Sequence, residues 1–452
     1  MIRHVDAIVL GGGMAGLAAA DAFQHEGLRV LLVEAAPEVG GLARSIVVGG
    51  EPIEPYYHHV FPQDAETRDL IVRLGRSSDL EWLPARMAIV HRGLVWPFDG
   101  PADLLRFGAL SLPSRLRLAL ATGVQVLRRD VSRLDRNPVG LEGPRWFGRE
   151  AYDVVWRPLL TAKFGDRSDE VAMAWLRARL VQRWGARGAT GDRLGYLRGG
   201  IGRLATAFAE DLRARDVELR VGQPATGLSQ VEGEWVLTTA SSDGPIARAP
   251  IVVAALAGNI LQGLIDLPDP YRHIVGAIPY RGIVCALVVL SQQISPYYWT
   301  NVTDRLGLGC VGIIEHTNLV DAARYGGRHL VYLAHYVDPS GPAWSASADG
   351  LLGGVEGVLQ TLNPRFRRDW VLDMHVARDP YAQPVPLAGG PMRQLTVRTG
   401  LAGLYHASLA HVYPDDRGVS MALDIGRRAA AAGLEDDRVA AHGSSSSRLH
   451  RG

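Results

Sequence analysis

Residues 7–34 read AIVLGGGMAGLAAADAFQHEGLRVLLVE, and this stretch decides the fold. The run DAIVL, which ends at residue 10, predicts a buried strand, and LRVLLVE, which ends at residue 34, predicts a second one. Between them, MAGLAAADAFQHEG predicts a helix, for which Gly27 is a suitable stop. The order strand, helix, strand is the start of a βαβ unit, so an α/β protein is expected.

Three glycines follow the first strand with the spacing G-x-G-x-x-G, at Gly11, Gly13 and Gly16. The first glycine of this motif permits a tight turn, the second lets backbone amides approach a pyrophosphate, and the third lets the helix pack closely on the sheet. The positive end of the helix dipole faces the phosphates. Glu34 ends the second strand, where an acid accepts hydrogen bonds from a ribose diol and repels a 2′-phosphate. The alternative is a glycine-rich turn in an ordinary βαβ unit, but the full pattern favours dinucleotide binding.

A second pair of glycines, Gly40 and Gly41, follows in APEVGGLARS. A plain NAD-binding fold does not require this pair, whereas a larger cofactor, whose pyrophosphate and flavin pass the loop, has a use for it. The alternative is a surface turn. The cofactor-binding residues expected in this part of the chain are Gly11, Gly13, Met14, Ala15, Gly16, Glu34, Ala35, Gly40, Gly41, Leu42 and Arg44.

The segments VLGGGMAGLAAA and VLLVEAAPEVGGLARS together resemble the N-terminus of the FAD-dependent amine oxidase superfamily. This superfamily includes protoporphyrinogen oxidases, phytoene desaturases and, more distantly, UDP-galactopyranose mutases. The resemblance implies that the cofactor is FAD. It also implies a Rossmann-like FAD-binding domain that is interleaved with a mixed α+β substrate domain and a helical insertion.

Two later segments extend the resemblance. In VELRVGQPATGL, Ala225 matches a small residue that the family places near the adenine. In GLYHASLAHVYPDDRGVSMALDIGRRAA, the turn at Gly418 and the helix after it match a motif that meets the flavin pyrimidine ring, where the helix dipole stabilises negative charge. Many members carry an acidic residue near the start of this motif, where this chain has Ser408. The cofactor-binding residues that the resemblance implies here are Ala225, Ser408, Arg417, Gly418 and Val419.

The predicted elements divide the chain into interleaved parts. Residues 1–95 are expected to form the first part of the FAD-binding domain and the start of the substrate lobe, 96–190 a helical insertion that caps the substrate, 191–260 the second FAD-binding part, 261–395 the substrate domain, and 396–434 the C-terminal FAD-binding part. The tail 435–452 is polar and rich in serine, so it is predicted to be disordered.

Composition excludes several classes of protein. The 452 residues are 47% hydrophobic, which suffices for a large core, and the 48 basic and 47 acidic residues nearly balance, which argues against nucleic-acid binding. The two cysteines have no metal-type spacing and favour a reducing cytoplasm. The N-terminal apolar stretch lacks the architecture of a signal peptide. No apolar run reaches the roughly 18–20 residues that span a bilayer. The oligomeric state is not predicted.

A cluster of four rings, Tyr56, Tyr57, His58 and His59, follows the second glycine pair. Adjacent histidines point to opposite faces of an extended chain and no further ligand motif accompanies them, so no metal site is expected. Alternation places Tyr57 and His59 on one face. The HVF that begins at His59 resembles a segment of the mutases, so His59 is expected to lie nearest the flavin and is one candidate catalytic residue.

Two further clusters are candidates for the substrate side. The segments SPYYWTNVTD and GIIEHTNLV carry aromatic and polar residues near strand ends, and HVYPDD places Tyr413, a second candidate catalytic residue, beside the predicted flavin turn. The alternative is that the aromatic residues are core and that the EHT sequence caps a helix near Asn318. The expected substrate-binding residues are Tyr57, Trp96, Tyr297, Trp299, Glu315 and His316.

The helices predicted within residues 101–133 are rich in leucine and arginine, as in LLRFGALSLPSRLRLAL. Such a helix could lie on a membrane, with arginine at the headgroups and leucine below. The alternative is an amphipathic helix that packs its apolar face on the lobe.

Three functions remain open from the sequence. The first is an FAD-dependent oxidoreductase in which the flavin N5 takes a hydride from a small organic substrate that is apolar, isoprenoid or sugar-linked. The second is a reduced-FAD mutase of sugar nucleotides, because HRGLVWPFDGPADL is similar to a hairpin of the UDP-galactopyranose mutases. The third is a flavoprotein without catalytic activity.

Overall fold

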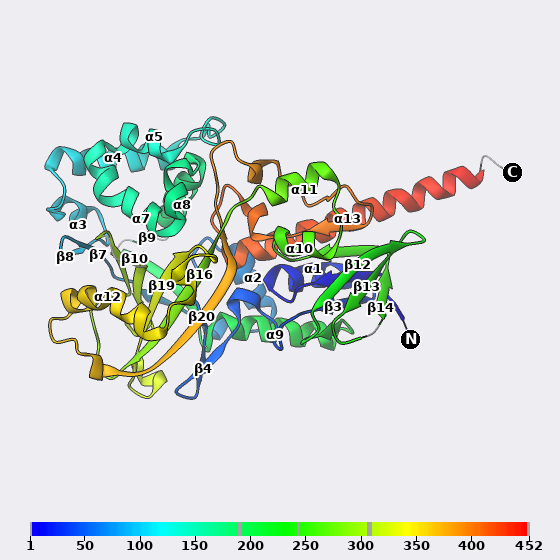
Figure 1. Ribbon diagram of the computed structural model, residues 1–452, viewed down its shortest axis with the longest axis horizontal. Coiled ribbons are helices and arrows are strands. Elements are labelled where there is room, and N and C mark those ends of the chain that lie inside the picture. Colours follow the sequence, from blue (N-terminus) through cyan, green and yellow to red (C-terminus); the bar gives the residue numbers. More distant parts are fainter. Residues whose placement is uncertain (1, 186, 189–190, 243, 305–309, 450–452) are drawn as a thin grey trace.

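The computed structural model describes residues 2–185, 187–188, 191–242, 244–304 and 310–449. Its dinucleotide-binding domain contains a sheet of five parallel strands in the order β11 (Glu218–Arg220), β3 (Val30–Val33), β2 (Ala7–Leu10), β15 (Ile251–Ala254) and β21 (Leu404–His406). The three central strands are buried along their whole length, as their continuous apolar sequences predict. Because the strands come from three distant parts of the chain, this domain is interleaved with the rest (Figure 1).

Alternate residues of the central strands enter two different cores. Ala7 and Val9 face a core formed with three helices, whereas Ile8 and Leu10 face a small sheet on the other side. The helices are α1 (Met14–His25), α9 (Gly200–Ala214) and α13 (Val419–Leu449). The small sheet has the strand order β1 (Arg3–His4), β14 (Pro245–Ala249), β13 (Glu234–Thr239) and β12 (Ala225–Val231). The helices, the five-stranded sheet and the small sheet thus form three layers. The first glycine turn follows strand β2 of the middle layer.

The helices α1 and α13 cross at close range. A Cβ atom on Gly426 would lie 2.0 Å from the carbonyl oxygen of Ala15, so only glycine fits at this crossing. The crossing brings the N-terminal turns of both helices to one cavity, which they line together.

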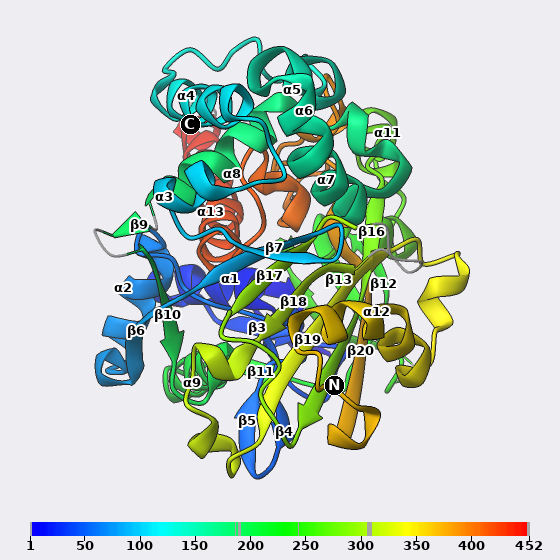
Figure 2. The same cartoon turned by 90° about the vertical axis from the view of Figure 1, so that its left-hand side faces the viewer.

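The second lobe is a mixed sheet of seven strands. Their order is β20 (Val371–Pro384), β16 (Tyr280–Leu290), β19 (His329–Val337), β18 (Cys310–Glu315), β17 (Trp299–Val302), β7 (Met87–His91) and β8 (Leu94–Pro97). Neighbouring strands are antiparallel except for β17 and β7. The helix α12 (Ala348–Leu362) covers one face of this sheet (Figure 2).

A helical cap with its own core lies over one end of the large sheet, as the sequence predicts for the helical insertion (Figure 2). Its helices are α3 (Pro101–Arg106), α4 (Leu112–Leu127), α5 (Val139–Phe147), α6 (Arg149–Ala151), α7 (Arg157–Phe164) and α8 (Met173–Gly185). Phe107, Phe147 and Phe164 are fully buried inside the cap. The helix α7 packs against the large sheet, so the cap is anchored close to the lobe junction.

Shorter elements connect these parts. They are the hairpin β4 (Ile46–Val48) and β5 (Glu51–Ile53), the sheet of β6 (Leu80–Pro84), β10 (Gly191–Leu197) and β9 (Arg187–Gly188), and the helices α2 (Ala65–Arg73), α10 (Gly258–Leu264) and α11 (Asp269–Gly276).

The C-terminal helix differs from the prediction made from the sequence. The helix α13 continues to Leu449 and extends beyond the body of the molecule, so residues 435–449 are helical where a disordered tail is predicted (Figure 1). Ion pairs hold the first part of this segment, because Arg398 binds Glu435 and Asp436 and Arg438 binds Glu26. Composition alone does not reveal these partners, which are distant in the sequence.

Candidate active site

The first glycine turn has the geometry of a dinucleotide site. Gly11 has a φ of +99°, which strongly favours glycine, and a Cβ atom on Gly16 would lie 1.8 Å from the carbonyl oxygen of Gly11. Gly13 precedes the first turn of α1, and a Cβ atom on it would meet nothing of the protein closer than 4.0 Å. The space in front of Gly13 is therefore open, and the free amides at the start of α1 face it.

The second glycine pair packs against the first turn. Gly40 donates a backbone hydrogen bond to the carbonyl oxygen of Gly12 at 2.8 Å, and Gly40 and Gly41 have φ values of +113° and +57°. A Cβ atom on Gly41 would lie 3.3 Å from Cα of Gly13. The pair therefore packs against the first glycine turn rather than forming an isolated surface turn. Arg44 closes this loop by donating to the carbonyl oxygen of Gly41 at 3.2 Å.

Glu34 lies beside the first glycine turn and does not line the large cavity to which Gly13 belongs. Its carboxylate accepts hydrogen bonds from the backbone amides of Gly12 and Ala36, and Ala35 between them is exposed. Gln223 donates its backbone N–H to the carbonyl oxygen of Glu34 at 2.9 Å. Ala225 follows two residues later, so the structure brings the two residues expected near the ribose and adenine to one end of the site.

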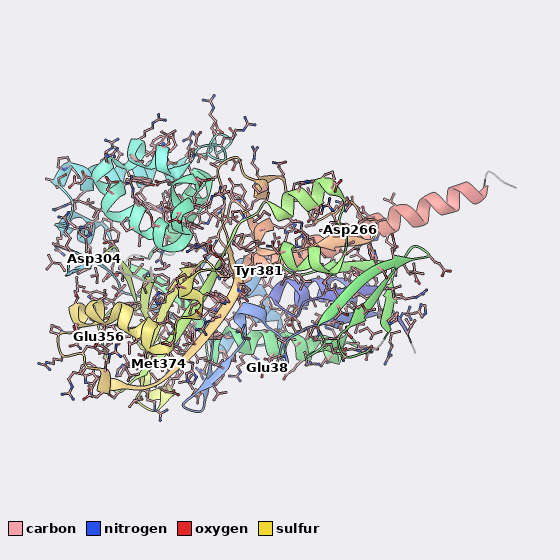
Figure 3. The ribbon with its side chains drawn as sticks, in the orientation of Figure 1. Glu38, Asp266, Asp304, Glu356, Met374 and Tyr381 are labelled. Carbon is pink, nitrogen blue, oxygen red and sulfur yellow. The ribbon has the colours of Figure 1, made fainter. Side chains whose placement is uncertain are left out.

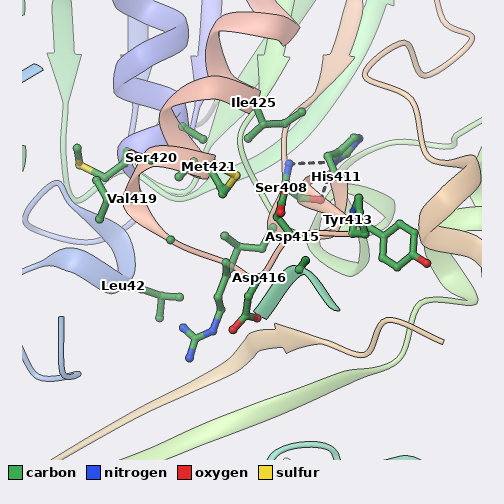
Figure 4. Close-up of a pocket in the computed structure, with 18 of the residues that line it drawn as sticks. Leu42, Ser408, His411, Tyr413, Asp415, Asp416, Val419, Ser420, Met421 and Ile425 are labelled. Carbon is green, nitrogen blue, oxygen red and sulfur yellow. Dashed lines mark hydrogen bonds between the residues drawn. The ribbon is translucent and has the colours of Figure 1, made fainter. Parts of the chain in front are cut away.

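The N-terminus of α13 enters the site from the other side. Gly418 and Val419 line the cavity, and the neighbouring Ser420 hydroxyl is 2.9 Å from that of Thr67 on α2. Ser408 precedes the short helix Leu409–Val412, and its hydroxyl donates to Nδ1 of His411 at 2.9 Å (Figure 4). This local bond occupies the hydroxyl of Ser408.

One cavity of about 1060 Å³ joins these pieces to the substrate side. Tyr381 on β20, which lines it, lies near the middle of the molecule where the lobes meet (Figure 3). The sequence-predicted residues that line this cavity are Gly13, Met14, Ala15, Gly40, Gly41, Leu42, Tyr57, His59, Trp299, Ser408, Tyr413, Arg417, Gly418 and Val419, several of which Figure 4 shows.

The alternation predicted for residues 56–59 is wrong for His58. Tyr56 is buried in the core, but His58 and His59 both line the cavity beside Tyr57. The chain forms no regular strand here, so successive side chains do not alternate between two faces. Nδ1 of His58 is 2.8 Å from the carbonyl oxygen of Tyr56, which turns the ring back towards its own backbone.

His59 is held by aromatic neighbours. Its ring packs edge-on against Phe61, with centroids 4.8 Å apart, and Nδ1 is 3.1 Å from the hydroxyl of Tyr298. Burial, together with the charges of Arg183 and Arg179, lowers the pKa of His59 well below its usual value. The ring is therefore neutral and suits a cavity wall.

Replacement of His59 by alanine is expected to change the flavin absorption spectrum and turnover more than the matched change His58→Ala. The His59 ring contacts Tyr298 and Phe61, whereas Nδ1 of His58 bonds to the carbonyl oxygen of Tyr56 in its own segment. Absorption spectra and kcat of both variants test this, and equal or negligible effects would contradict it.

Tyr57 belongs to an aromatic wall with Trp299 and Tyr336. The rings of Tyr57 and Trp299 meet edge to face at 4.9 Å, and the hydroxyls of Tyr57 and Tyr336 are 3.2 Å apart. Arg417 donates to the Tyr336 hydroxyl and, at 3.0 Å, to Oε1 of Gln383. The side chain of Arg417 therefore extends to the substrate sheet, although the resemblance implies cofactor binding.

Tyr413 lines the cavity, but its hydroxyl is occupied. It donates to Oδ1 of Asp135 at 2.8 Å, a contact that joins the flavin turn to the cap. Burial, followed by this bond, raises the pKa of Tyr413 above its usual value, so the phenol stays protonated. Tyr413 thus positions the turn, and the contact gives no support to the catalytic role predicted for it.

Two predicted substrate residues, Glu315 and His316, are buried away from the cavity. Glu315 accepts hydrogen bonds from the backbone amides of Ile294 and Ser295, both at 2.8 Å. His316 contacts the Tyr325 hydroxyl through Nε2 at 2.9 Å. The structure contradicts the prediction for both, because Glu315 at the end of β18 and His316 at the start of the short helix His316–Asn318 turn their side chains into the core.

Trp96 and Tyr297 also lie outside the cavity lining. Trp96 on β8 packs edge-on against Phe107 of the cap, with centroids 5.7 Å apart. The guanidinium carbon of Arg86 lies 5.0 Å from the ring centroid of Tyr297. The structure therefore gives no support to the prediction that these two aromatic residues bind substrate.

The most unusual lining residue is Lys163, which sequence reasoning missed. It is the only lysine in a chain with 48 lysine and arginine residues in total. Its Nζ is 2.6 Å from Oδ2 of Asp416, and it lies 4.9 Å from the ring centroid of Trp175. Burial lowers the pKa of Lys163 to about 8, although Asp416 acts in the opposite direction.

Asp416 is the centre of a small charge cluster. Besides Lys163, it contacts Arg179 at 3.4 Å and accepts a bond from Nε1 of Trp175 at 3.3 Å. Burial alone would raise the pKa of Asp416, but Lys163 and Arg179 lower it below its usual value. A permanently charged carboxylate thus holds an amine that can change its protonation state near neutral pH. The one feature of the sequence that could have drawn attention to this cluster is that Lys163 is the only lysine.

The described ranges hold no group of three His, Cys, Asp or Glu side chains that could bind a metal ion. The described residues do include a glycine turn in which Gly16 has no room for a Cβ atom, and Glu34 bonds to this turn. The turn and the second glycine pair both contribute residues to the wall of a large cavity. These features fit a dinucleotide that carries a redox ring, and they define an FAD-dependent oxidoreductase.

Comparison with known proteins gives the family. The model of the flavin containing amine oxidoreductase family matches residues 14–432. A curated relative, flavin-containing amine oxidase B of Sus scrofa, is 31% identical over 110 residues, which cover 24% of this chain and 21% of that protein. The chain belongs to the flavin containing amine oxidoreductase family.

Two solved structures show the same fold. A protein described as a protoporphyrinogen oxidase, from Exiguobacterium sp. 255-15, has a TM-score of 0.74 and 20% identity over 96% of this chain and 99% of that chain. A reduced UDP-galactopyranose mutase has a TM-score of 0.74 and 15% identity over 95% of this chain and 96% of that chain.

Proposed function

We propose that the enzyme oxidises an organic substrate that carries a C–H bond next to a hydroxyl or amino group. The observation that carries this proposal is the union, in one cavity, of the N-terminal turns of α1 and α13, an aromatic wall, and the buried Lys163–Asp416 pair. FAD, when bound, supplies the acceptor for the hydride that leaves the substrate carbon.

The residues that would hold FAD follow the chain from one end of the site to the other. The backbone amides of Met14 and Ala15 would bind the pyrophosphate, and Glu34 would accept hydrogen bonds from the ribose. The N-terminus of α13 at Val419 would stabilise negative charge on the flavin pyrimidine ring.

The aromatic wall would position the substrate and exclude water. Tyr57, Trp299 and Tyr336 present ring faces and edges that bind apolar parts of a ligand. Burial raises the pKa of Tyr57 well above its usual value, so its hydroxyl remains a hydrogen-bond donor. This wall suits a substrate with an apolar, isoprenoid or sugar ring portion.

Lys163 would accept the proton that the oxidation releases. In its neutral form, Nζ takes the proton of the substrate O–H or N–H group while the C–H bond gives up its hydride, and the product contains C=O or C=N. Asp416 stabilises the ammonium group that results. The cluster thus contains a base whose pKa is close to a physiological pH.

Anaerobic mixing tests the proposed reaction. A panel of candidate alcohols, amines and isoprenoid or sugar-linked compounds is added to the oxidised protein, and the visible flavin absorbance is followed. Bleaching by one compound alone, together with its oxidised product, is the expected result. If no compound bleaches the flavin and turnover instead requires prior reduction, the proposal of net oxidation is overturned.

A second candidate function is supported by arginines on α8. Arg177, Arg179 and Arg183 of this helix all line the cavity, and several guanidinium groups in one cavity suit a diphosphate. A sugar-nucleotide mutase that uses reduced FAD without net redox change would have this requirement. Isomerisation of a nucleotide sugar by the pre-reduced protein, with no reductant consumed in proportion to product, would favour this candidate.

A further inference from the structure

The cap helix α4 exposes apolar side chains along one side. Leu112, Leu116, Leu120, Val124 and Leu127, which together we call the α4 face, are 56%, 55%, 71%, 42% and 80% exposed. Their spacing of three or four residues places them on a single stripe. An ordinary surface helix has a polar side towards solvent, whereas α4 presents this apolar stripe to solvent.

The cap does not need the α4 face for its own packing. The opposite side of the helix, with Leu118, Ala121 and Gln125, is the side buried in the protein. Figure 2 places α4 at the outer edge of the cap. The alternative that the sequence leaves open, an amphipathic helix packed entirely on the lobe, therefore leaves these five side chains unexplained.

The surroundings of the α4 face are basic. Residues 101–150 contain nine arginines and five acidic residues, whereas the whole chain has a net charge of +1. Arg115, Arg117 and Arg128 donate to backbone carbonyl oxygens. Glu150 and Asp130 offset part of the charge of Arg115 and Arg128, but arginines outnumber carboxylates in this segment. An apolar stripe flanked by arginines is complementary to an anionic phospholipid surface, where the side chains insert and the guanidinium groups reach phosphates.

The α4 face leads towards the active-site cavity. Val131 follows Leu127 by four residues, is 37% exposed and lines the cavity. Val181 on α8 is 38% exposed and also lines it. A surface that covers the α4 face would therefore lie beside the cavity entrance.

We propose that the α4 face docks on the surface of an anionic bilayer. No helix in the described part of the chain is long and apolar enough to cross a membrane, so the contact is interfacial. The helix lies along the headgroup region with its five apolar side chains inserted, and the cavity entrance opens next to the lipid.

Vesicle sedimentation tests the docking surface. The full chain with its FAD is mixed with vesicles of phosphatidylcholine, with and without phosphatidylglycerol. We expect binding to the phosphatidylglycerol vesicles that weakens with salt, and a reduction of at least about tenfold in the double variant Leu120→Glu/Leu127→Glu. The matched control Val72→Glu/Leu372→Glu replaces side chains that are 64% and 54% exposed elsewhere, and it should bind like the unaltered protein.

Three results would overturn the proposal. They are no binding of the unaltered protein to phosphatidylglycerol vesicles, equal binding of the two double variants, and a dimer in light scattering that Leu120→Glu/Leu127→Glu dissociates while neither form binds vesicles. The last result would assign the α4 face to a second copy of the chain. Flavin absorbance and the thermal unfolding midpoint of every variant show that the fold is intact, so a loss of vesicle binding is distinct from a failure of the proposed oxidation.

Discussion

Replacement of Lys163 by methionine is expected to lower kcat by about 10²- to 10⁴-fold while the bound FAD remains. Methionine keeps the length and apolar stem of lysine but cannot accept a proton. The amine contacts Asp416 in the turn before α13 and lies 5.9 Å from the ring centroid of Tyr336 in the cavity wall, whereas the two glycine turns proposed to bind FAD lie on other elements. Steady-state kinetics with the substrate identified by anaerobic mixing, together with flavin absorbance, measures the two effects separately.

The pH dependence of kcat follows from the same residue. The pKa of Lys163 is lowered from 10.5 to about 8, and the neutral amine is the reactive form. Activity should therefore rise by about tenfold per pH unit below pH 8 and level off above it. Lys163→Arg stays charged across this range, so it should be slow at every pH. A fully active Lys163→Arg variant would show that the site needs a positive charge rather than a base.

The single lysine permits a direct test that does not depend on activity. Reductive methylation with ¹³C-formaldehyde labels Lys163, which is the only lysine of this sequence, and the N-terminal amine, which has an ordinary pKa of about 8. The signal of Lys163 is therefore identified as the one that Lys163→Met lacks. The titration midpoint of this signal should lie near 8 and rise towards an ordinary lysine value when Asp416 and the cavity are exposed by unfolding. A midpoint in the folded protein at an ordinary lysine value would contradict the proposed role.

Substitution of Gly13 by valine is expected to weaken FAD binding by more than about tenfold while the apoprotein folds normally. A Cβ atom at Gly13 would meet nothing of the protein closer than 4.0 Å, and the residue has a φ of −70° that any amino acid adopts. The added side chain would occupy the space through which backbone amides approach the pyrophosphate. FAD titration of the apoprotein and thermal unfolding provide the two measurements.

Gly16→Ala is the comparison that separates cofactor loss from damage to the fold. Its Cβ would lie 1.8 Å from the carbonyl oxygen of Gly11, so α1 must move and the apoprotein should lose about 1–3 kcal/mol of stability as well as FAD affinity. Gly357→Ala on α12, where nothing lies within 4 Å of the added atom, is the neutral control. If Gly13→Val retains normal FAD affinity, the assignment of the pyrophosphate site is wrong.

The part of the site that the sequence predicts well is local. Gly11, Gly13, Gly16 and Gly40 act within about 30 residues of one another, and each has a backbone reason that does not depend on distant packing. Glu315 and Trp96 are predicted to bind substrate, but neither lines the cavity. Whether such a residue reaches the cavity depends on the direction in which its side chain points. A polar or aromatic residue near a strand end can face either a cavity or a core, and hydrophobic pattern alone does not distinguish these outcomes.

The sequence by itself determined the FAD-binding fold, because strand, glycine turn, helix and terminal acid interact with their neighbours in the chain. Only the tertiary structure decided which side chains share the cavity. Lys163 and Asp416 are 253 residues apart, and they meet because the cap packs over the turn that precedes α13. The same packing left Leu120 and Leu127 on the outside of the cap. Such contacts depend on the summed burial of whole elements, which no short sequence pattern specifies.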